Sequence, residues 1–140
     1  MQRKSAMSYH DLEIWKSAHA LGVIVHKMTL EKMPKFEMYE EGSQIRRSSK
    51  AISVNIVEGF GRRRYKNDFI RFLTYALASC DETREHLEYI VETGSMTDRA
   101  LYEHILAGYD VLGRKVNSFL RSVIESHMTP KSASPSGRPR

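Results

Sequence analysis

The sequence predicts an all-α protein that folds as an antiparallel up-and-down four-helix bundle. Apolar residues recur at spacings of three and four in four successive stretches, which is the spacing of one face of an α-helix. Gly or Pro residues separate these stretches, and short connections between three of the helices favour antiparallel neighbours. The chain has 140 residues, enough for one hydrophobic core and too few for two.

The first helix is expected from about Leu12 to Met28, after a capping box made by Ser8 and Asp11. Pro34 ends any helical continuation in the connector that follows. The residues expected to face the core of the bundle from this helix are Leu12, Trp15, Ala18, Leu21, Val25 and Met28.

The second helix is expected from about Tyr39 to Glu58, with small residues between its isoleucines and a stop at Gly59 and Gly61. The third begins near Asn67 or Asp68, buries Phe72 and ends at Thr93-Gly94. Thr97 and Asp98 open a fourth helix of about 27 residues, which spans roughly 40 Å at 1.5 Å per residue.

The composition is ordinary for a globular protein, with 41% apolar and 28% charged residues. Cys80 is the only cysteine, so neither a disulfide within the chain nor a cysteine-based zinc site is expected, and Cys80 should be a small buried filler. No apolar run approaches the ~20 residues that a membrane span needs, and no signal peptide is visible, so we expect a cytoplasmic protein without membrane contact. The expected organisation is a flexible N-terminus at 1–8, the bundle at 9–126 and a disordered basic Ser/Pro tail at 127–140.

The motifs of common enzyme classes are missing from the sequence. A di-metal carboxylate centre in a bundle needs Glu-x-x-His pairs, and none of the six histidines has a Glu three positions before it. Glu82 and His86 are four residues apart, which favours a solvent-exposed helix pair over a metal site. Gly59-Phe60-Gly61 lacks the Lys-Ser/Thr ending of a phosphate-binding loop. We therefore predict no catalytic residue, no cofactor and no metal.

A basic cluster is the most informative polar feature. From Arg46 to Arg71 there are eight basic residues and two acids, a local net charge of +6. Phe60 and Tyr65 lie among them and could stack on unpaired bases, so the cluster predicts nucleic-acid binding. The alternative is ion pairing with acids of the third and fourth helices, such as Glu82, Glu85 and Glu88. The predicted nucleic-acid-binding residues are Arg46, Arg47, Lys50, Arg62, Arg63, Arg64, Lys66 and Arg71.

Polar residues in or beside the apolar stripe of the second helix need partners, because an unpaired buried polar group is costly. We predict that Asn55, Glu58 and Glu82 belong to a structural polar network, with Arg46, Arg47 or Arg71 as a partner of Glu58 within the chain or across a subunit interface.

Four segments together resemble the four-helix-bundle family of 23S rRNA intervening-sequence proteins. The most specific is Asn55-Ile-Val-Glu58-Gly-Phe-Gly-Arg62. The others are Tyr9-x-Asp-Leu-x-x-Trp15, Tyr39 with Ser43-Gln-Ile-Arg-Arg47, and Phe69-Ile-Arg-Phe-Leu-x-x-Ala-x-Ala-Ser-x-x-Glu82. The resemblance extends from about Tyr9 to Val123. The chain differs from the family's pattern at Ser53, where Pro is common, at Glu40-Glu41 and at Cys80.

The resemblance implies a ring-like homo-oligomer, often a pentamer with a central channel, and no known catalytic residues. Members are encoded in insertions of bacterial 23S rRNA genes or elsewhere in bacterial chromosomes. The family is similar in fold to accessory proteins of diversity-generating reverse transcriptases, which bind nucleic acid and their polymerase. The function that we expect is a non-enzymatic homo-oligomeric adaptor that binds RNA or DNA, with a reverse transcriptase or another protein as a candidate partner. The alternative is an oligomeric protein-binding scaffold with no nucleic-acid role.

Overall fold

The computed structural model describes residues 7–126, so the predictions for 1–6 and for the basic tail at 127–140 lie outside the described residues. The described part is all-helical and confirms the four-helix bundle. The elements are a short 3₁₀ helix η1 (Tyr9–Asp11), α1 (Glu13–Glu31), a second 3₁₀ helix η2 (Lys35–Tyr39), α2 (Glu41–Gly61), α3 (Lys66–Glu92) and α4 (Arg99–Ser126).

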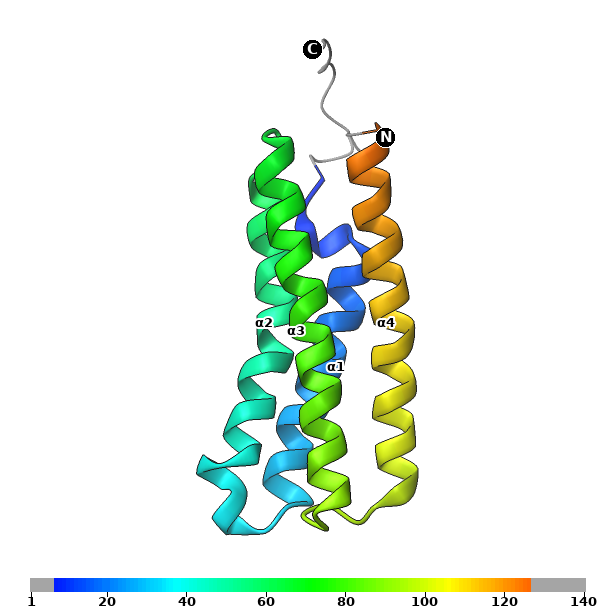
Figure 1. The fold of residues 1–140 in the computed structure, drawn as a ribbon. Helices are drawn as coiled ribbons and strands as arrows, with labels where there is room; N and C mark the ends of the chain where they lie inside the picture. The colour runs from blue at the N-terminus through cyan, green and yellow to red at the C-terminus, as the bar shows by residue number, and fades with distance from the viewer. Residues whose placement is uncertain (1–6, 127–140) are drawn as a thin grey trace, which may run out of the picture.

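The four α-helices alternate in direction, as an up-and-down bundle requires (Figure 1). Each packs against its neighbours in the chain, and α1 packs against α4 to close the bundle. The apolar stripes of all four helices meet in one core, where Ile45, Ile52 and Ile56 of α2 have no exposed surface. Within the described residues no helix is both long enough and apolar enough to span a membrane.

Small polar residues bring α2 and α3 together. Ser48 and Ser49 are buried, and the Thr83 hydroxyl donates a hydrogen bond to Ser48 Oγ at 2.9 Å across the two helices. Cys80 is fully buried, as predicted, and burial raises the pKa of its thiol to about 11. The protonated thiol donates a hydrogen bond to the Tyr109 carbonyl at 3.5 Å.

Several helix ends differ from the sequence prediction. The Ser8 and Asp11 capping box is present, but it caps η1 rather than α1. The second helix continues past its predicted end at Glu58 and through Gly59, and it ends at Gly61. Gly59 instead permits close packing of α3, since a Cβ atom there would lie 3.2 Å from Cβ of Phe72.

The end of α3 and the start of α4 agree with the sequence prediction. Gly94 has a φ of +80°, and the Ser95 N–H bonds back to the Ile90 carbonyl at 2.9 Å, which is the pattern of a Schellman cap. Asp98 Oδ1 accepts a hydrogen bond from the Leu101 N–H at 3.0 Å, and that bond is the main cause that lowers the pKa of the Asp98 carboxyl.

Two aromatic residues that were predicted to be core residues are only half-buried. Trp15 packs against the edge of the core, and Phe72 lies at the surface of α3. In α1, Ile14 is buried at 5% exposure next to Trp15. The helical face that meets the core is therefore rotated slightly from the one that the sequence pattern indicated.

Gly42 offers a test of how tightly η2 packs on α2. A Cβ atom at Gly42 would lie 2.7 Å from the Glu37 carbonyl oxygen, which belongs to the backbone and cannot move cheaply. We expect Gly42→Ala to lower the free energy of unfolding by about 1–3 kcal/mol through overpacking, although alanine favours a helix by about 1 kcal/mol. Gly61→Ala is the control, because a Cβ atom there meets nothing within 4 Å. Urea unfolding followed by circular dichroism measures both, and equal midpoints for the two variants would contradict the packing.

Candidate nucleic-acid interface

The turn between α2 and α3, residues 62–66, carries four of the predicted binding residues, and we call it the basic turn. Its backbone is fixed by hydrogen bonds from the Arg62 N–H to the Gly59 carbonyl at 3.0 Å and from the Tyr65 N–H to the Arg62 carbonyl at 2.8 Å. Lys66 is half-buried, and the other four side chains are exposed. The turn therefore presents a cluster of cations from a backbone of defined shape.

Aromatic rings lie under the guanidinium groups of this region. The Arg63 guanidinium carbon is 3.9 Å from the centre of the Phe60 ring, and that of Arg64 is 6.0 Å from the Tyr65 ring. The half-buried Phe72 ring lies under two cations, with Arg62 at 5.0 Å and Arg71 at 5.6 Å. A guanidinium that stacks through its face presents its N–H groups at its edge, and Nη1 of Arg63 already donates a hydrogen bond to the Phe60 carbonyl at 2.8 Å.

Two acids neutralise part of this charge. Arg62 pairs with Glu58 at 3.6 Å and with Asp68 at 3.7 Å, and Arg71 pairs with Asp68 at 3.0 Å. All of these pairs are solvent-exposed, so each stabilises the fold only weakly. From residue 58 to 71 there are five basic side chains and two acids, which leaves a net charge of +3.

Of the other four predicted binding residues, Arg71 lies on α3 close to the basic turn, and the remaining three lie on α2. Arg46 and Arg62 are sixteen residues apart, which corresponds to about 24 Å along a helix. Arg46 is half-buried and donates to the Thr29 hydroxyl at 2.9 Å and to the Met38 carbonyl at 2.6 Å, so its guanidinium ties η2 to α1. Arg47 is exposed. The structure thus divides the single cluster predicted from the sequence into two regions.

Lys50 lies against α1. Its ammonium group donates to Nδ1 of His26 at 2.9 Å, which requires that ring nitrogen to be unprotonated. Burial lowers the pKa of His26, and the nearby charges of Lys50 and Arg46 lower it further. His26 is therefore neutral at neutral pH, and Lys50 is exposed at the surface of α2 beside it.

The predicted structural network of Asn55, Glu58 and Glu82 is wrong. The Asn55 amide donates to the Ala51 carbonyl of its own helix at 2.9 Å, and Glu58 is exposed beside Arg62. Glu82 pairs with His86 at 3.5 Å on α3. The three residues make separate contacts, because Glu58 lies in the last turn of α2 and faces the basic turn rather than the core.

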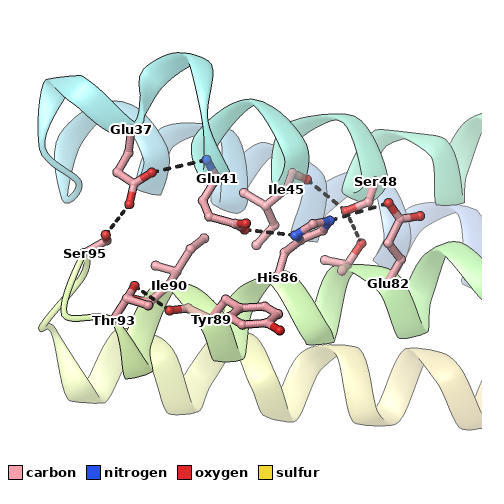
Figure 2. Close-up of polar contacts among 11 residues, drawn as sticks. Glu37, Glu41, Ile45, Ser48, Glu82, His86, Tyr89, Ile90, Thr93 and Ser95 are labelled. Carbon is pink, nitrogen blue, oxygen red and sulfur yellow. Dashed lines mark hydrogen bonds and ion pairs between the residues drawn. The ribbon is translucent and has the colours of Figure 1, made fainter.

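A different polar network joins α2 to α3, and the sequence analysis missed it (Figure 2). Nδ1 of His86 lies 2.9 Å from Glu41 Oε1, so His86 bridges Glu41 and Glu82 with only 17% of its side chain exposed. Of the expected solvent-exposed Glu82–His86 pair, Glu82 is exposed and His86 is mostly covered. Nearby, Glu37 accepts hydrogen bonds from the Glu41 N–H at 3.2 Å and from the Ser95 hydroxyl, which links η2 to the turn before α4.

This second network is structural, since its members bond to one another. Across residues 7–126, no group of three or more His, Cys, Asp or Glu side chains is arranged to hold a metal ion. In the sequence, the acidic pair Glu40-Glu41 was the visible signal of this network. Its partner, His86, could be identified only from the register of α2 against α3.

Comparison with known proteins agrees with the fold and the resemblance. The family model described as 23S rRNA-intervening sequence protein matches residues 10–118. A crystal structure of a protein of unknown function from the S23 ribosomal protein family of Bacteroides thetaiotaomicron matches with a TM-score of 0.66 and 25% identity. That match covers 77% of this chain and 98% of the other. The comparison with curated proteins gave no match.

Proposed function

The chain belongs to the 23S rRNA-intervening sequence protein family, and on this premise we propose that it is a non-enzymatic, homo-oligomeric adaptor that binds RNA or DNA in the cytoplasm. The basic turn is the contact surface. The observation that carries the proposal is the group of exposed guanidiniums stacked on aromatic rings at one end of the bundle. Ribosomal RNA is the candidate nucleic acid, and a reverse transcriptase is a candidate protein partner.

In this proposal the arginines of the basic turn contact phosphates, and the 60%-exposed Tyr65 ring stacks on an unpaired base. Such contacts position the nucleic acid without selecting a sequence, because they reach the backbone and the faces of bases rather than base edges. A single-stranded region fits better than a duplex, since stacking needs an accessible base.

The direct test measures the affinity of the purified protein for labelled single-stranded RNA, single-stranded DNA and duplex DNA at several salt concentrations. If the four cations of the basic turn each neutralise one phosphate of a single strand, the slope of log K against log salt is about −3. Absence of binding to every probe, together with an absorbance spectrum free of co-purifying nucleic acid, would overturn the proposal.

A second candidate function is a protein-binding scaffold, in which basic side chains pair with acids of a neighbouring subunit. The exposed acids of α3, among them Glu82, Glu85 and Glu88, favour this candidate. Under it, variants of the basic turn change the assembly and leave any affinity for nucleic acid unaffected.

A further inference from the structure

A groove of about 610 Å³ runs along the outer surface of α1 and α2. Its middle is apolar and open to solvent, with Val23 43% and Val54 57% exposed. One end is aromatic and also includes the acid Glu58, and the other end is cationic. The aromatic end is lined by Tyr9, Trp15 and His19, and the cationic end by His26, Lys27 and Lys50.

A complementary surface lies on α3 of the same chain. Six exposed residues recur at spacings of three and four, so they form one solvent-exposed face of the helix. Tyr75 and Tyr89 are 48% and 53% exposed, and acids lie between and beyond them. We call this face the α3 stripe, and it consists of Tyr75, Ala78, Glu82, Glu85, Tyr89 and Glu92.

We propose that the α3 stripe of a second copy of this chain occupies the groove between α1 and α2. This inference rests on the homo-oligomer of the proposed function, and it identifies the two surfaces through which neighbouring copies contact each other. Because the groove and the stripe are different surfaces, the contact is head-to-tail, and repetition of such a contact closes a ring when the rotation permits.

The register of the helices supports this pairing. Ser48 of α2 bonds to Thr83 of α3, and these two helices are antiparallel, so Lys50 lies at about the height of residue 81. Lys50 also bonds to His26, which places the cationic end of the groove at the same height. The aromatic end of the groove lies at His19 and Val57, which are seven residues along their helices from His26 and Lys50. This end is therefore at about the height of residue 74 of α3.

Copies in a ring around an axis parallel to the bundle are related by rotation alone, so residues at equal heights meet. Glu82 and Glu85 of one copy then lie opposite Lys50 and Lys27 of the next. Tyr75 lies opposite the aromatic and apolar part of the groove. The charges and the apolar surfaces therefore match in a single register, which is the complementarity expected of a specific interface.

The test is the mass of the assembly, measured by light scattering after gel filtration and by native mass spectrometry over a dilution series. We expect Val54→Asp, Lys50→Glu and Glu85→Lys each to raise the dissociation constant of the assembly at least tenfold, because each places a charge in an apolar contact or opposite a like charge. The double variant K50E/E85K restores the opposite charges and should bring the dissociation constant back to within about threefold of the original.

Matched controls come from exposed positions of α4. Lys115→Glu and Glu125→Lys make the same charge changes outside both surfaces, and they should leave the mass unchanged. Circular dichroism melting confirms that each variant is folded. If Val54→Asp fails to fold, the charge swap and its reversal by the double variant decide the result.

The outcomes separate this inference from the proposed function. A monomeric wild-type protein would overturn the interface and the homo-oligomer together. An oligomer whose mass is unaffected by all three single variants would overturn only the interface. Loss of RNA binding by Val54→Asp at unchanged mass would assign the groove to nucleic acid and would likewise overturn the inference.

Discussion

Replacement of Phe69 by alanine is expected to lower the free energy of unfolding by about 3–5 kcal/mol, a large part of the 5–15 kcal/mol typical of a domain. Phe69 has no exposed surface and lies in the first turn of α3. Its ring makes an edge contact with Phe119 of α4, with the ring centres 5.9 Å apart, and it packs on Gly59 of α2. Its loss would leave a cavity where three helices meet, and urea unfolding followed by circular dichroism measures the effect.

Phe72 provides the matched control, since it is the same residue type three positions further along α3. Its ring is half-buried and lies under the Arg62 and Arg71 guanidiniums rather than in the core. Phe72→Ala should therefore cost about 1 kcal/mol, from lost surface contacts and cation–π interactions. An equal loss of stability in the two variants would contradict the burial of Phe69 as the cause.

The sequence predicted the helices and most of the core because burial repeats with the period of the helix. Ile45, Ile52 and Ile56 mark the buried face of α2, and all three are fully buried. Trp15 and Phe72 were misassigned because a large apolar side chain at the edge of a stripe has the same spacing as one at its centre. Only the packing of neighbouring helices decides which of them is covered.

Polar contacts between helices were predicted poorly. Glu41 and His86 are forty-five residues apart, and their contact depends on how far α2 is shifted along α3, which helical periodicity does not specify. Gly59 illustrates the same difficulty, because a glycine near a helix end can stop the helix or admit a neighbouring side chain. The division of the basic cluster, by contrast, could have been found from the sequence, since sixteen helical residues separate Arg46 from Arg62 by about 24 Å.

Replacement of Arg62, Arg63 and Arg64 together by alanine is expected to weaken binding to single-stranded RNA about 100-fold at 0.1 M salt. Each phosphate contact on a single strand contributes about −0.7 to the slope of log K against log salt, so the loss of three contacts makes the slope shallower by about 2. Titration of labelled RNA by fluorescence anisotropy at several salt concentrations measures both quantities. All three side chains are exposed, so the variant should keep the helical content of the parent.

The control variant removes the same three charges from α4, as Arg114→Ala, Lys115→Ala and Arg121→Ala. These side chains are also exposed, but they lie outside the basic turn. If binding depends on contacts made by the turn, the α4 variant should retain most of the affinity and the original salt slope. If binding depends only on the overall field of a protein with a net charge of +5, the two triple variants should lose affinity equally. The comparison therefore tests whether the cations at the end of the bundle act as a site, which the affinity of the unmodified protein alone does not reveal.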